Sequence, residues 1–86
     1  MKVFIVRDED HGSLFVAANL GVVKRELIRT NWVHGHSLVW NCEKHDYWDS
    51  LLEVYGENWR ESFMDFGVED LENLGIYVKE IEVVQD

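Results

Sequence analysis

Three histidines and one cysteine lie close together in the middle of the chain and are the residues best suited to hold a metal ion. They are His34, His36, Cys42 and His45. Nitrogen and sulfur ligands of this number and type suit tetrahedral Zn²⁺, and the Cys-x2-His spacing lets two ligands from one turn reach the same ion. Structural zinc sites usually have two paired ligand turns, however, and a His-x-His pair in a strand points its rings to opposite faces. We therefore expect no cofactor, with a zinc-ordered binding module as the alternative.

The thiol of Cys42 is also the chain's best candidate nucleophile, with His45 three residues away as a base. No oxyanion hole, glycine-rich phosphate loop, Gly-x-Ser-x-Gly pattern or Walker pattern accompanies it. Because no nucleophile, base and orienting group can be named together, the sequence does not predict an enzyme and we assign no catalytic residue.

The segment from Asp8 to Gly12 is similar to the start of a calcium-binding loop, with carboxylates at alternate positions and a glycine soon after. The glycine comes one position early, and the twelfth position of such a loop would be Asn19 rather than Glu. We therefore predict a hairpin turn here, in which the carboxylates accept hydrogen bonds from the local backbone.

Charge is distributed unevenly along the chain. Residues 1–42 contain five Lys and Arg and four Asp and Glu, whereas residues 43–86 contain three and thirteen, within a total net charge of −9. Such an acidic segment repels phosphate backbones, so we expect no direct binding of nucleic acid. It suits a basic protein surface, including one that normally holds DNA or RNA, although solubility alone also explains an excess of carboxylates.

The candidate partner contacts are the carboxylates of the second half together with one tryptophan. They are Asp49, Glu53, Glu57, Glu61, Asp65, Glu69, Asp70, Glu72 and Trp40. Helical spacing places Asp49, Glu53 and Glu57 along one predicted stripe, and Glu61 and Asp65 along a second.

Four tryptophans are many for this length, and their positions differ. Trp48 and Trp59 lie on apolar helical faces and are predicted to belong to the core. Trp32 and Trp40 flank the least regular segment; we expect both to be buried in the core, and the alternative is a partly exposed indole that serves as an interface anchor.

The chain has 86 residues, of which 47% are hydrophobic and 13% aromatic, enough for one core and one domain over residues 1–86. A single cysteine cannot form an internal disulfide, which favours a reducing, cytoplasmic setting. The first residues do not match a signal peptide or a membrane segment, so we expect no membrane association.

The pattern of apolar residues predicts an α+β fold: a two-layer domain with an antiparallel sheet of three or four strands in the order ββα(β)ααβ and helices on one face. The predicted strands are 3–6, 14–18, 37–40 and 76–84, and the predicted helical segments are 19–31, 48–56, 59–67 and 68–75. In the first helix we expect Leu20, Val23 and Leu27 to face the core, with Lys24 and Arg25 turned outward.

The opening Lys2–Gly12, the segments Phe15–Ala17 and Asn31-Trp32, and the later Gly56–Trp59 and Gly75–Val78 together resemble a type of short open reading frame of phages and prophages of Gram-positive bacteria. The resemblance spans most of the chain and implies a dispensable accessory protein acting inside a bacterial host cell. Small acidic anti-CRISPR proteins, to which this chain is similar in size and charge, occupy nucleic-acid channels of their targets. The leading hypothesis is therefore binding to a host protein, and a homo-oligomeric structural or ligand-binding protein, such as a homodimer, is a further alternative.

Overall fold

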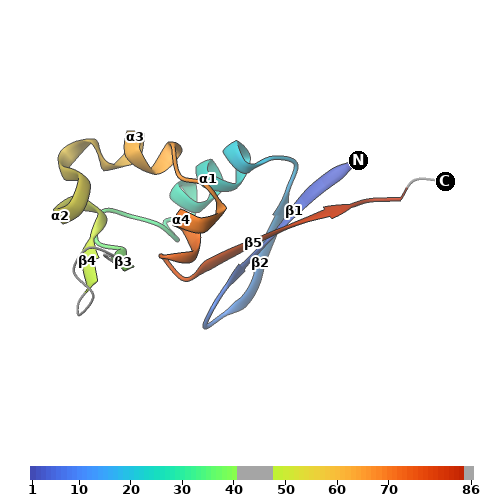
Figure 1. The fold of residues 1–86 in the computed structure, drawn as a ribbon, viewed down its shortest axis with the longest axis horizontal. Helices are drawn as coiled ribbons and strands as arrows, with labels where there is room; N and C mark the ends of the chain where they lie inside the picture. Colours follow the sequence, from blue (N-terminus) through green and yellow to red (C-terminus); the bar gives the residue numbers. More distant parts are fainter. Residues whose placement is uncertain (41–47, 85–86) are drawn as a thin grey trace.

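The computed structural model describes residues 1–40 and 48–84, and these form an α+β fold, as expected. The elements in chain order are β1 (Lys2–Asp8), β2 (Gly12–Ala17), α1 (Leu20–Arg29), β3 (Leu38–Trp40), β4 (Trp48–Ser50), α2 (Leu51–Tyr55), the 3-10 helix η1 (Gly56–Asn58), α3 (Trp59–Met64), α4 (Val68–Glu72) and β5 (Ile76–Glu82). The molecule measures 48 × 24 × 20 Å, with the start of β1 and the end of β5 at the same end of its long axis (Figure 1).

The larger sheet is antiparallel, with the strand order β2-β1-β5. β1 is the central strand. Its run of β-branched and aromatic residues suits this position, because such side chains pack well against neighbouring strands on both sides. Val6 pairs with Val78 of β5, and Phe4 pairs with Ala17 of β2.

The expected strand at 37–40 exists as β3, but it does not join the larger sheet. It pairs instead with β4, and Trp40 lies opposite Trp48 in this two-stranded ribbon. The prediction of a helix from residue 48 was therefore wrong for its first turn. The Ser50 hydroxyl accepts a hydrogen bond from the Glu53 N–H at 3.2 Å, and this N-cap starts α2 only at Leu51.

Helix α1 begins where the sequence predicted, because the Asn19 side chain accepts a hydrogen bond from the Val22 N–H at 2.9 Å. Val23 and Leu27 are completely buried. The prediction that Lys24 faces solvent was wrong: only 7% of this residue is exposed. Its ammonium group donates hydrogen bonds to the carbonyls of Met64 and Phe66, at the C-terminal end of α3.

The remaining helices are shorter than the apolar spacing indicated. Gly56 has a positive φ of 76°, and η1 separates α2 from α3 there. The prediction that α3 runs to Gly67 was wrong: α3 ends at Met64 with Asp65 as its C-cap, and Gly67 serves instead as the N-cap of α4. Within the described residues, no helix has the length and apolar character needed to cross a membrane.

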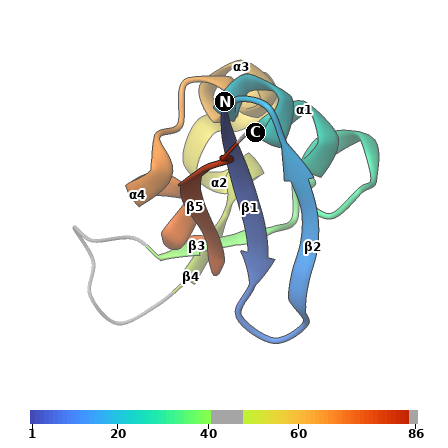
Figure 2. The same ribbon diagram turned by 90° about the vertical axis from the view of Figure 1, so that its right-hand side faces the viewer.

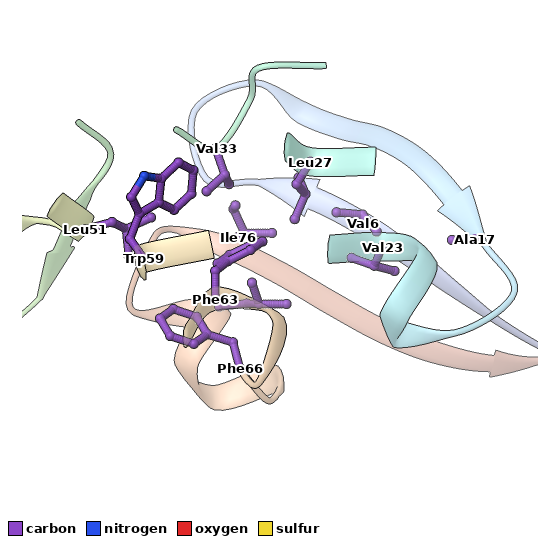
Figure 3. Packing of buried hydrophobic residues seen from close by; sticks show 11 residues of the cluster. Val6, Ala17, Val23, Leu27, Val33, Leu51, Trp59, Phe63, Phe66 and Ile76 are labelled. Carbon is purple, nitrogen blue, oxygen red and sulfur yellow. The ribbon is translucent and has the colours of Figure 1, made fainter. Parts of the chain in front are cut away.

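The core lies between the larger sheet and the helices (Figures 2 and 3). Val6 and Ile76 contribute from the sheet, Val23 and Leu27 from α1, and Phe63 from α3 (Figure 3). The opposite face of the sheet is open to solvent, where side chains such as Val16 and Tyr77 are exposed. Helices therefore cover one face of the sheet only.

Candidate functional site

The carboxylates predicted to contact a partner lie in the segment from β4 to α4. Seven are exposed, namely Glu53, Glu57, Glu61, Asp65, Glu69, Asp70 and Glu72, and Asp49 is half-buried. Residues 48–75 contain these eight carboxylates and one basic side chain, Arg60. In Figure 1, α2 and α3 lie toward the end of the molecule opposite the two termini. The segment that forms β4 and the helices α2 to α4 is therefore strongly acidic.

The expected stripe of Asp49, Glu53 and Glu57 along one helix is not formed. Asp49 belongs to β4, Glu53 to α2 and Glu57 to η1, because the helix starts late and is interrupted at Gly56. Glu61 in α3 and Asp65 at its C-cap lie one turn apart on the same helix, as predicted.

Glu53 and Asp70 contribute to helix caps within the fold. Glu53 accepts a hydrogen bond from the Ser50 N–H at 3.4 Å, and Asp70 accepts one from the Gly67 N–H at 2.9 Å. Each holds the start of a short helix, which any substitution there would weaken. Burial of the Tyr55 hydroxyl raises its pKa, and the negative charge of Asp70 raises it further.

Five carboxylates, which we call the acidic helical surface, have no such role: Glu57, Glu61, Asp65, Glu69 and Glu72. No Lys, Arg or His in the described part of the chain forms a salt bridge with any of them. Asp65 and Glu72 also lie at the C-terminal ends of α3 and α4, where a negative charge opposes the helix dipole. Glu61 and Glu69, by contrast, lie in the first turns of α3 and α4, where a negative charge complements the helix dipole, so the unfavourably placed charges of this surface are Asp65 and Glu72.

The predicted zinc ligands are only partly placed by the structure. His34 and His36 lie in a turn rather than a strand, and their ring centroids are 6.2 Å apart. The Nδ1 atom of His34 accepts the His36 backbone N–H at 3.2 Å. Cys42 and His45 lie outside the described residues. Among the residues that are described, no group of three metal-binding side chains comes together, and the zinc hypothesis stays untested.

The segment from Asp8 to Gly12 forms the predicted hairpin turn between β1 and β2. The Oδ2 atom of Asp8 accepts the backbone N–H groups of Asp10 at 3.0 Å and His11 at 3.1 Å, and it lies 2.8 Å from the His11 ring nitrogen. Burial raises the pKa of Asp8, but these hydrogen bonds, from the His11 ring first, lower it by more, so the net pKa is below its ordinary value.

The exposure of the four tryptophans differs in part from the prediction. Trp59 is 5% exposed and belongs to the core, as expected, with the Arg60 guanidinium 4.8 Å from its ring centroid. The prediction that Trp48 is buried was wrong, since it is 50% exposed in β4. Trp40 is half-buried and packs edge-to-face against Trp48 at 5.3 Å. Trp32 is exposed, and its ring packs edge-to-face against His11 at 5.1 Å.

A cavity of about 390 Å³ lies beside Trp32 and Trp48 and was not anticipated from the sequence. Its lining residues come from four separate parts of the chain, so no local motif indicates it.

Comparison of the chain with protein-family models, with curated proteins and with solved structures finds no match. Function must therefore be argued from the surface chemistry of this chain.

Proposed function

We propose that this chain is a non-enzymatic phage or prophage accessory protein that binds a basic host protein through its acidic helical surface. The observation that supports this most strongly is that, within the described residues, no salt bridge reaches the five carboxylates of that surface. Glu61 and Asp65 repel one another at helical spacing, and Asp65 and Glu72 oppose helix dipoles, while Glu61 and Glu69 complement theirs. A partner that supplies Lys and Arg side chains would turn each of these unfavourable terms into a favourable one.

The sign of the charge also indicates the class of partner. A surface with eight carboxylates and one arginine over residues 48–75 repels nucleic acid but complements a protein groove that binds nucleic acid. The proposed role is therefore inhibition of a host nucleic-acid-processing or defence system, as in anti-CRISPR proteins. Long-range attraction of this kind raises the association rate and weakens as salt screens it.

The test compares two double charge reversals in a tagged protein. Glu61→Lys with Asp65→Lys reverses the acidic helical surface, and neither carboxylate contributes to a cap. Glu80→Lys with Glu82→Lys on β5 is the matched control, because it changes the net charge equally and breaks only two exposed salt bridges, to Lys2 and the N-terminus. Proteins captured from lysate of a Gram-positive host are eluted in a salt gradient and identified by mass spectrometry.

The expected result is one basic protein that elutes at moderate salt, is retained by the β5 control and is lost with the α3 reversal. The salt dependence is then measured with the purified pair. Equal loss in both variants, or binding that does not change with salt, would contradict recognition by the acidic helical surface. Thermal unfolding of both variants establishes that any loss is not a loss of fold.

A further inference from the structure

The cavity beside Trp32 and Trp48 is formed by segments that meet only in the folded chain. Asp8 and Glu9 come from the β1–β2 turn, and Leu38 comes from β3. Its volume of about 390 Å³ falls near the lower end of the range typical of ligand sites, about 300–1,000 Å³. A single side chain or a small organic ion fits this space better than a nucleotide or a folded element.

The apolar part of the wall is unusually accessible. Trp32, Leu38 and Trp48 are 36%, 55% and 50% exposed, and all three line this one cavity. Exposed apolar side chains that gather around a hollow are typical of binding sites, whereas singly scattered ones are not. Indole faces also attract cations, and the tryptophan ring does so more strongly than any other aromatic side chain.

The charged part of the wall is negative. The side chain of Asp8 is 15% exposed, and the three contacts to its Oδ2 atom hold it in place. The Glu9 N–H donates to the Gly75 carbonyl at 3.0 Å, which fixes the backbone of Glu9 at the cavity. A Cβ atom at Gly75 would lie 3.6 Å from the Glu9 Oε2 atom, so this carboxylate lies over the glycine that lines the wall. No described lining residue is Lys or Arg.

We propose that this pocket binds an arginine side chain presented by the partner protein. A guanidinium group is planar, stacks on an indole and donates parallel hydrogen bonds to a carboxylate. It can therefore contact the tryptophans and the carboxylates of the pocket at the same time. A lysine ammonium is more strongly hydrated and lacks the planar face. This inference rests on the proposed function and extends it. The acidic helical surface attracts the basic partner, and the pocket binds one arginine side chain of that partner.

The first test uses a blocked amino acid, N-acetyl-L-arginine methylamide, as the probe. In ¹H–¹⁵N NMR spectra each tryptophan contributes an indole N–H signal, and Trp32→Phe and Trp48→Phe variants assign the two at the pocket. Addition of the probe should shift these two signals along a saturable curve and leave that of the buried Trp59 unchanged. The citrulline analogue has the same shape without the charge and should produce no saturable shift.

The second test separates this pocket from general acidity. Glu9→Gln removes a pocket carboxylate, and Glu72→Gln is the matched control, because it removes an equal charge from α4 outside the pocket. The affinity of the probe for Glu9→Gln should fall by about 1.5-fold to fivefold, as the loss of an exposed ion pair implies, and its affinity for Glu72→Gln should be unchanged. Equal binding of arginine and citrulline probes, tighter binding of the lysine analogue, or unchanged binding to Glu9→Gln would overturn the proposal.

The Glu61→Lys with Asp65→Lys variant distinguishes the two proposals. It should lose the protein partner yet bind the arginine probe as the unmodified chain does, because neither residue lines the pocket. If the probe binds but no basic partner is found, the arginine pocket is supported and the proposed function is contradicted. A basic partner bound equally well by Glu9→Gln and the unmodified chain would remove the pocket's role and leave the proposed function standing.

Discussion

Replacing Lys24 by methionine tests how the core joins α1 to α3. The Lys24 ammonium group donates to the carbonyls of Met64 and Phe66, the latter at 3.0 Å. These carbonyls lie at the C-terminal end of α3, where the last backbone acceptors of a helix have no partner within it. A cation there also complements the partial negative charge of the helix end. Methionine keeps the length of the apolar stem and removes only the charge and the donors.

The expected loss of stability follows from two opposing effects. Each hydrogen bond from a charged donor contributes about 1.5–3 kcal/mol. Methionine avoids the cost of keeping an ammonium group buried, which recovers part of the loss. We expect a net decrease of about 2–4 kcal/mol in the free energy of unfolding, against a total of about 4–13 kcal/mol for 86 residues. At this chain length, such a decrease lowers the melting temperature by about 10–20 °C.

Urea unfolding followed by tryptophan fluorescence measures the change. Arg25→Met is the control, because Arg25 is the next residue of α1 but is exposed, and it should change stability by less than about 0.5 kcal/mol. A Lys24→Met protein as stable as the unmodified chain would refute the reasoning. It would mean that desolvation of the ammonium group cancels its two hydrogen bonds.

Two further predictions concern local packing. Asp8→Ala should lower the free energy of unfolding by about 1–3 kcal/mol at pH 7. The pKa of Asp8 is lowered in the fold, so the ionised carboxylate stabilises the fold above its unfolded-state pKa of about 3.9. This contribution is lost as the pH falls through the folded-state pKa. Urea unfolding at pH 7 and 2.5 checks this, and an equal difference at both would contradict it. Gly35→Ala should cost about 1–3 kcal/mol, because its Cβ would lie 2.7 Å from the Leu52 Cδ1 atom. Adding Leu52→Ala should cost less than the sum of the single changes, and strict additivity would rule out this contact as the cause.

Comparison of the helices shows how far local sequence reasoning extends. The start of α1 was predictable because Asn19 and Val22 are three residues apart and need no other part of the chain. The start of α2 was misplaced, because Trp48 fits the apolar spacing of a helix and its pairing with Trp40 is a tertiary event. Tertiary pairing overrides a local preference of this size, since helix propensities differ by less than about 1 kcal/mol per residue for most side chains.

The candidate sites follow the same division. The acidity of the second half is a property of composition and was visible at once, but the sequence did not separate the capping carboxylates, Glu53 and Asp70, from the five of the acidic helical surface. Lys24 looked like a solvent-facing residue because the carbonyls that it binds are 40 and 42 residues away. The zinc and homodimer hypotheses stay predictions.

The sequence by itself determined the α+β class, the Asn19 cap of α1, the turn between β1 and β2, and the acidity of the second half. Each of these depends on residue type or on contacts within about one turn. Only the tertiary structure decided that Lys24 is buried, that Trp48 is exposed, and that Glu9, Trp32 and Trp48 share one pocket. These depend on contacts between distant segments, whose geometry is set by how the sheet and the short helices pack and not by periodicity along the chain.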